Sequence, residues 1–189
     1  MTKQLTKTKN SKFRKFINNL YPTYVYDSVE SIPYFVFEKY SIELIMLDMD
    51  NTLINHDVKY NDNIKKWIKG LKKRGIKLYI LSNSWSSEKV KEVAHKLGLQ
   101  YYLKAKKPFL KGFNYILEKE NVQKQHAIMI GDQIFTDVWG GNRFGIKTIL
   151  VTPIEKRESI LTKIKRPLEK VLLNNYYKNR EEQKQCKWF

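Results

Sequence analysis

Two aspartates stand one residue apart at the end of an apolar run in this sequence. The run is LIML, residues 44–47, and Asp48 and Asp50 follow it in the string DMDNT. Two carboxylates that share one small site repel each other unless a cation or a proton resolves the conflict. The pair therefore suggests a metal ion on one aspartate and a proton on the other. For the pair alone, a strand end whose aspartates cap loop amides is an equally good interpretation.

Polar residues follow three later apolar segments in the same way. Ser82 follows the second segment, Lys106 and Lys107 follow the third, and the fourth ends in GDQIFTD, which carries Asp132 and Asp137. Carboxyl ends of parallel strands meet at one edge of a sheet, where sites form. A carboxylate nucleophile, a hydroxyl, a lysine and further carboxylates for Mg²⁺ are the groups that phosphoryl transfer requires. Four such elements in register favour a phosphoryl-transfer site.

The segments that must position these groups alternate between short apolar runs and helical periodicities. Strands are predicted over residues 43–47, 77–81, 101–104, 127–130 and 148–151. Apolar spacing predicts helices around 64–71, 90–97, 110–117 and 135–143, the third opening after Pro108. Strands that alternate with helices of this length predict an α/β fold, a Rossmann-like three-layer structure with a parallel sheet.

Composition limits the class of protein and its compartment. The chain has 189 residues and 42% hydrophobic residues, enough for one domain with a real core. Its formal net charge is +17, which favours polyanionic partners such as anionic lipid, nucleic acid or phosphorylated substrates. A lone cysteine, Cys186, forms no internal disulfide and suits a reducing cytoplasm. No apolar run of about 18 residues, the length that reads as a spanning helix, is present.

The basic charge is concentrated toward the two ends of the chain. We predict a basic N-terminal segment over residues 1–20, a central domain over 21–155 and a basic helical extension over 156–189. In the first segment, Phe13, Phe16, Ile17 and Leu20 have helical spacing with basic residues between them. This stripe either packs on the sheet or a partner, or lies on an anionic membrane. In the extension, Pro167 predicts two helical pieces rather than one.

The motifs together resemble the haloacid dehalogenase (HAD) superfamily of phosphatases. DMDNT is similar to its first motif, Ser82 to its second, Lys107 to its third and GDQIFTD to its fourth. The string GDQIFTDVWGGNRFGIKTILVTPI resembles the YqeG-like group of subfamily IIIA, which includes phosphatidylglycerophosphate phosphatases. In the second loop, SNSWSSEKV departs from the pattern expected of that group, which has a second Asn and an Arg near Lys89.

The resemblance implies a role for each matching residue. Asp48 is the expected nucleophile and Asp50 the expected general acid and base. The expected phosphate-binding or loop-holding residues are Thr52, Ser82, Asn83 and Lys107. The expected Mg²⁺ site comprises the Asp48 carboxylate, the Asp50 backbone carbonyl, Asp132 and, in support, Asp137.

The stretches between Asp50 and the first helix, and between Ser82 and Lys107, are too short for a cap domain. A capless site admits large substrates, and we expect phosphatidylglycerophosphate at the inner membrane surface. Two alternatives stay open: a capless phosphatase of a nucleic-acid end or nucleotide, and a non-catalytic RNA- or ribosome-associated protein. No oligomeric state is predicted.

Overall fold

The computed structural model describes residues 16–155 and 160–185. The chain divides into two compact units, which we call the sheet unit (residues 22–156) and the terminal unit (residues 1–21 and 157–189). The predicted site residues all fall in the sheet unit. Each unit is described by itself below.

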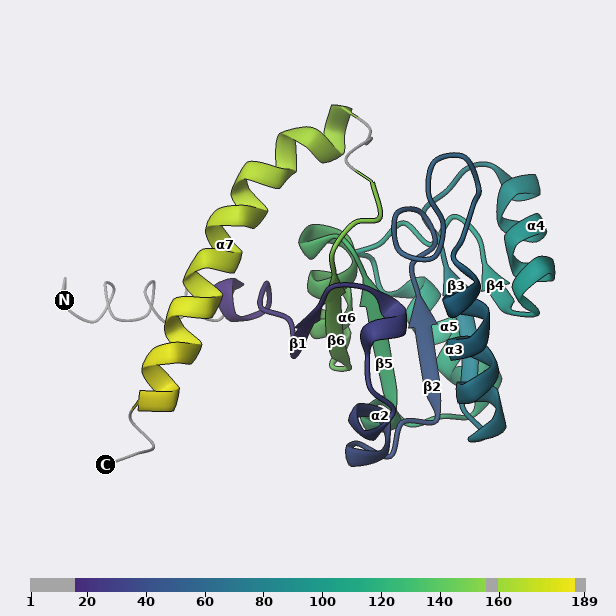
Figure 1. Cartoon of the computed structure of the whole chain (residues 1–189), viewed down its shortest axis with the longest axis horizontal. Coiled ribbons are helices and arrows are strands. Elements are labelled where there is room, and N and C mark those ends of the chain that lie inside the picture. The colour runs from purple at the N-terminus through teal and green to yellow at the C-terminus, as the bar shows by residue number, and fades with distance from the viewer. Residues whose placement is uncertain (1–15, 156–159, 186–189) are drawn as a thin grey trace. The chain divides into compact units, whose positions relative to one another are not determined.

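A parallel sheet of six strands forms the centre of the sheet unit (Figure 1). Its spatial order is β1-β6-β5-β2-β3-β4, so β2 lies between β5 and β3. All five neighbouring pairs are parallel. The strands are β1 (Tyr24–Tyr26), β2 (Leu44–Leu47), β3 (Lys77–Leu81), β4 (Gln100–Tyr102), β5 (Ala127–Gly131) and β6 (Lys147–Val151).

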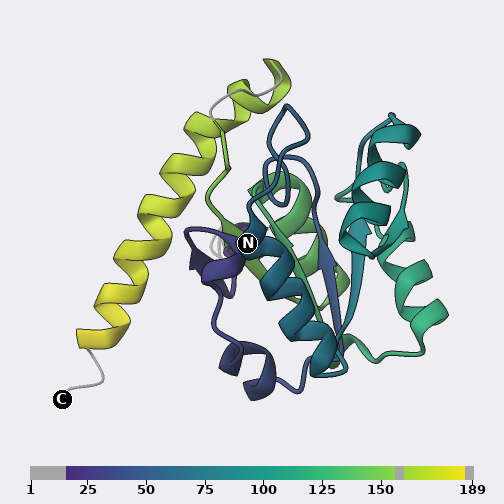
Figure 2. The same cartoon turned by 45° about the vertical axis from the view of Figure 1, so that its right-hand side comes forward.

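Helices cover both faces of this sheet (Figures 1 and 2). Side chains alternate along a strand, so Ile45 and Leu47 of β2 pack on one face while Leu44 and Met46 pack on the other. The first face is covered by α2 (Phe35–Lys39), α3 (Asp62–Lys73) and α4 (Ser87–Leu97). The second is covered by α5 (Lys111–Glu120) and α6 (Trp139–Phe144). The predicted three-layer Rossmann-like fold is therefore confirmed.

The helix ends follow local sequence signals. Asn61 caps α3 by accepting a hydrogen bond from the Asn63 amide, and Ser86 caps α4 by accepting one from Lys89. Gly98 ends α4 in the left-handed conformation, with φ of 61°, which costs glycine little.

Several predicted elements differ from the structure in their bounds. Strand β1 was not predicted, because three half-buried residues at a sheet edge give no usable alternation. Helix α5 begins at Lys111, so Pro108 lies in the preceding loop instead of the first helical turn. The predicted fourth helix begins as a π-helix, Ile134–Val138, and continues as α6. This π-turn lies directly after β5, where the fourth motif sits.

The terminal unit contains one long helix, α7 (Ile160–Gln185), and a short helical stretch at residues 16–18. The prediction of two pieces broken at Pro167 is wrong: a proline removes one main-chain hydrogen bond, and the helix-favouring residues on either side continue through it. Tyr21 and Tyr176 pack with ring centroids 5.7 Å apart. None of the described helices has the length and hydropathy required to cross a membrane.

The N-terminal apolar stripe is only partly within the described residues. Phe13 lies outside them. Phe16 is exposed, Ile17 is half-buried and Leu20 is buried. At least one member of the stripe is therefore a core residue.

Candidate active site

The register of the sheet brings the predicted site residues to one edge. Leu47, the last residue of β2, pairs with Ile80 of β3 and with Ile130 of β5. The next residue, Asp48, continues this pairing, because its amide donates to the Ile130 carbonyl at 2.8 Å. Ser82 and Asp132 each come directly after the neighbouring strands. Three polar residues far apart in sequence are therefore neighbours because their strands end together.

Lys107 joins this group from the loop between β4 and α5. Its Nζ lies 2.6 Å from Asp48 Oδ1 and 2.8 Å from Asp137 Oδ1, and its side chain is 1% exposed. Burial raises the pKa of Asp48 from 3.8 to about 7, although the Lys107 ammonium acts in the opposite direction. Burial alone would lower the pKa of Lys107, but Asp137 and Asp48 outweigh it and that pKa is raised. The ammonium is thus held charged between two carboxylates.

Three buried carboxylates at this edge form a candidate metal site. Oxygen atoms of Asp48, Asp132 and Asp137 lie within 4.8 Å of one another. Such a set offers the hard oxygen donors that Mg²⁺ prefers, so these residues fit a divalent cation. Gly131 permits the arrangement, since a Cβ there would lie 2.3 Å from Asp137 Oδ2.

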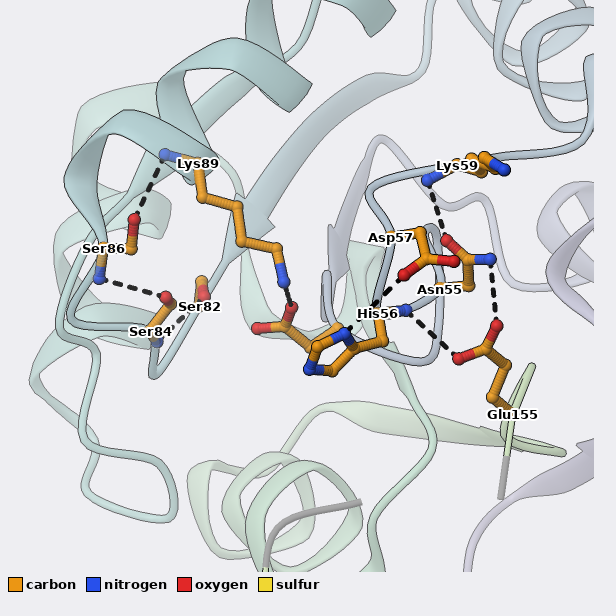
Figure 3. A network of polar contacts seen from close by, with 10 residues as sticks. Asn55, His56, Asp57, Lys59, Ser82, Ser84, Ser86, Lys89 and Glu155 are labelled. Atoms are coloured by element: carbon orange, nitrogen blue, oxygen red, sulfur yellow. Dashed lines mark hydrogen bonds and ion pairs between the residues drawn. The ribbon is translucent and has the colours of Figure 1, made fainter. Parts of the chain in front are cut away.

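Asp50 occupies a different environment from Asp48. The strand ends at Leu47 and the chain then turns, with Asn51 at φ of 62°, so the period-two rule no longer applies to Asp50. The Asp50 side chain is 48% exposed, and its Oδ1 lies 2.5 Å from Lys89 Nζ, which reaches across from the first turn of α4 (Figure 3).

Lys89 was not among the predicted site residues. It stands 39 residues after Asp50 and contacts it only because β2 and β3 are neighbours. The sequence held one signal for it, the departure of the SNSWSSEKV loop from the expected pattern at this position.

The loop after β3 braces the loop that carries Lys107. The Asn83 side chain accepts a hydrogen bond from the Lys107 amide at 2.7 Å and donates one to the Lys107 carbonyl at 3.1 Å. Ser82 is buried, and its Oγ accepts from the Ser84 amide at 3.0 Å. The structure therefore places Asn83 against the Lys107 backbone.

Thr52 is a buried residue of the turn that follows Asp50. It is 2% exposed, and together with Asn55, Tyr60 and Thr152 it lines a cavity of about 450 Å³ whose lining does not include the three carboxylates. The segment that follows β6 holds the loop beyond Thr52, because Glu155 accepts hydrogen bonds from Asn55 Nδ2 at 2.9 Å and from the His56 amide at 3.3 Å (Figure 3).

Comparison with known proteins decides the family. The model of the haloacid dehalogenase-like hydrolase family matches residues 2–151. The chain belongs to this family. This HAD-like hydrolase is 36% identical over 135 residues to a protein of Bacillus subtilis (strain 168) named "Probable phosphatase YqeG", covering 71% of this chain and 78% of that one. The predicted YqeG-like resemblance is confirmed, and with it the assignment to a family of hydrolytic enzymes.

Two further similarities to this HAD-like hydrolase are more limited. Over 44 residues, 23% of this chain and 18% of the relative, it is 41% identical to the glyceraldehyde 3-phosphate phosphatase of Pyrococcus abyssi (strain GE5 / Orsay). A solved structure of an uncharacterized protein from Listeria monocytogenes serotype 4b superposes with a TM-score of 0.50 at 22% identity, covering 63% of this chain and 86% of that one. The latter similarity shows the shared fold.

Proposed function

We propose that this protein is a Mg²⁺-dependent phosphatase that works through an aspartyl-phosphate on Asp48. The observation that carries the proposal is the position of Asp48 at the end of the central strand, with Lys107 Nζ 2.6 Å away. A buried carboxylate held by a buried ammonium is a restrained nucleophile, and the same ammonium offsets repulsion between that nucleophile and an incoming phosphate.

The first step transfers the phosphoryl group to the enzyme. An oxygen of the Asp48 carboxylate attacks phosphorus, the bond from phosphorus to the leaving oxygen breaks, and that oxygen takes a proton from Asp50. In the second step water attacks phosphorus and gives a proton to Asp50. The bond between phosphorus and Asp48 then breaks, which releases inorganic phosphate and restores both aspartates.

Asp48, Asp132 and the backbone carbonyl of Asp50 would hold the cation, with Asp137 in support. Bound there, Mg²⁺ supplies charge stabilisation to the transferring phosphoryl group. Asp137 supports the site by binding Lys107 and the Gln133 amide, the latter at 3.1 Å.

The remaining residues hold the phosphate or the loops around it. Ser82 and Lys107 bind phosphoryl oxygens. Asn83 acts through its two hydrogen bonds to the Lys107 backbone, which keep Lys107 directed at Asp48. Thr52 holds the turn after Asp50, where its burial fixes the loop.

We further propose that the substrate is a large phosphomonoester presented from outside, phosphatidylglycerophosphate at an anionic membrane surface. Between Asp48 and α3 the chain forms only turns and one β-bridge, so no inserted domain lies over this part of the site. An open site suits a headgroup held in a bilayer better than a small metabolite, which generally requires a lid to exclude water. The exposed Phe16 and the basic N-terminal segment support peripheral contact with such a surface.

Hydrolysis of nitrophenyl phosphate by the full chain tests the mechanism. Asp48→Asn should abolish turnover, because an amide cannot form the acyl phosphate, whereas Asp50→Asn should still form phosphoenzyme slowly and hydrolyse it poorly. Activity should require Mg²⁺, disappear with chelator and return poorly with Ca²⁺, whose oxygen shell is larger and looser. Wild-type turnover by Asp48→Asn, or full activity after exhaustive chelation, contradicts the proposal. A phosphate-release screen of lipid phosphates, sugar phosphates and oligonucleotide ends then tests the substrate.

A further inference from the structure

Two loops at the edge of the sheet that carries the candidate site expose large aromatic rings. Trp85, in the loop between β3 and α4, is 74% exposed, and Phe109, in the loop between β4 and α5, is 65% exposed. Two such rings on loops beside one site make a candidate docking surface.

The two loops are fastened to each other. The Ala105 amide donates to the Ser82 carbonyl at 2.9 Å, and the Asn83 side chain binds the Lys107 backbone. The Lys104 ammonium lies over the Trp85 ring, 5.1 Å from its centroid. The rings are therefore presented from a braced surface and not from independent loops.

The loop before α5 alternates between inward and outward side chains. Ala105 and Lys107 are buried, whereas Lys104, Lys106 and Phe109 are exposed. One lysine of this loop thus serves the candidate site while two face the solvent. We call Trp85, Lys104, Lys106 and Phe109 the site rim.

The charge of these loops selects an anionic partner. Residues 82–86 and 103–110 contain no aspartate or glutamate. The guanidinium of Arg143, an exposed residue, donates to the Pro108 carbonyl at 3.4 Å, which adds a cation beside Phe109. Aromatic rings interleaved with lysines suit the boundary of an anionic bilayer, where rings lie among headgroups and lysines meet lipid phosphates.

A single-stranded nucleic acid also binds aromatic rings and lysines, so the two partners must be separated. The terminal unit bears on this choice. Helix α7 exposes Leu168 and Val171, at 61% and 58%, on a segment rich in lysine. Exposed aliphatic side chains have no role in stacking on bases, whereas a bilayer accepts them together with the basic residues that flank them. The observations therefore favour lipid.

We propose that the site rim docks the enzyme on an anionic lipid surface, so that the substrate phosphate enters the site from the bilayer. Only the entry of substrate from the bilayer rests on the proposed function, because docking itself requires no turnover. The rim residues are separate from the N-terminal stripe, and they lie at the edge where Asp48 is found.

Sedimentation of the full chain with vesicles tests the rim. Wild type should bind phosphatidylglycerol vesicles and bind phosphatidylcholine vesicles much more weakly, with binding that declines as salt rises. The double variant Trp85→Ser, Phe109→Ser should lower the partition coefficient about tenfold, because interfacial burial of two rings is lost. The matched control is Phe35→Ser, which removes a ring that is 61% exposed on α2, an element that precedes β2 and so lies toward the opposite edge of the sheet.

A charge variant gives a second, independent measurement. Lys104→Glu, Lys106→Glu should lower binding by about tenfold or more, since each basic residue near an anionic surface contributes measurably. Its control, Lys66→Glu, Lys69→Glu, makes the same change in net charge on exposed lysines of α3 and should lower binding much less. Circular dichroism checks that all four variants are folded.

The outcomes separate docking from catalysis. Asp48→Asn should bind vesicles as wild type does, and its nitrophenyl phosphate activity decides the proposed function independently. The docking proposal is overturned if the rim variants bind vesicles like their controls. It is also overturned if the protein does not bind anionic vesicles and instead binds a single-stranded RNA oligonucleotide in a way that depends on Trp85.

Discussion

Replacing the buried Asp48 with asparagine should stabilise the metal-free protein while it destroys activity. The pKa of this carboxyl is raised from 3.8 to about 7, chiefly by burial. A pKa difference of about 3 corresponds to about 4 kcal/mol at about 1.4 kcal/mol per pKa unit. The folded state therefore holds an ionised Asp48 at a cost of about 4 kcal/mol at pH 8. Asparagine has nearly the same shape and no charge, so Asp48→Asn should raise the free energy of unfolding by about that amount.

The pH dependence has a definite sign. The folded carboxyl binds its proton more tightly than the unfolded one, so raising the pH from about 4 to about 7 deprotonates the unfolded chain first and favours unfolding. The advantage of Asp48→Asn should vanish below about pH 4, reach about 2 kcal/mol at pH 5 and approach about 4 kcal/mol at pH 8. Lys107 does not alter this window, because its raised pKa acts only at alkaline pH.

Urea unfolding in chelator at pH 5 and pH 8, followed by tryptophan fluorescence, measures both values. The control is Asp57→Asn, an exposed aspartate in the loop after β2, for which a change within about 0.5 kcal/mol is expected. Mg²⁺ at about 100 times its dissociation constant should narrow the difference by about 3 kcal/mol, because a ligand that binds only the folded wild type stabilises it. If Asp48→Asn is less stable than wild type at pH 8 in chelator, attraction to Lys107 outweighs burial and the reasoning fails.

Two further substitutions test the supporting contacts. Lys89→Met should lower kcat by freeing the Asp50 side chain, yet change the free energy of unfolding by less than about 1 kcal/mol because the ion pair is partly exposed. Lys91→Met, an exposed lysine on the same helix, is its control, and equal kcat values for the two variants would contradict the role. Gly131→Ala should destabilise the protein by about 1–3 kcal/mol and weaken Mg²⁺ activation, since its Cβ would displace Asp137. An unchanged Mg²⁺ dependence would show that Asp137 can move without consequence.

The sequence predicted the strands that hold the site because each is a short apolar run followed by a polar residue. Parallel pairing then required Asp48, Ser82 and Asp132 to lie close together. This prediction did not depend on the conformations of the loops. The third strand was placed one residue late and carried two residues too far, at 101–104 against Gln100–Tyr102, because the polar Gln100 gives no strand signal and the loop after it begins with an apolar residue. A short apolar run followed by a polar residue is therefore enough to predict the site residues that lie at strand ends.

Contacts between residues on different loops could not be predicted from the sequence pattern. The braces from Asn83 to Lys107 and from Lys89 to Asp50 join residues 24 and 39 positions apart, and their geometry depends on loop conformations that no periodicity encodes. The exposure of Trp85 belongs to the same class, since an aromatic residue in a loop is usually expected to pack. Helix α7 shows that a local signal can also mislead. Pro167 predicted a break, but the helix-favouring residues on either side continue the helix through it.

The two aspartates of the DMDNT motif have the same side chain but different surroundings in the structure. Asp48 continues the central strand and is enclosed with Lys107, whereas Asp50 comes after the turn begins, is half exposed and meets Lys89. A buried carboxylate and a solvated one, each with its own lysine, are suited to different tasks. In the proposed mechanism the enclosed group is the nucleophile, and the exposed group can exchange protons with water between the two steps. The end of strand β2 at Leu47 thus gives the two aspartates different exposure and different lysine partners.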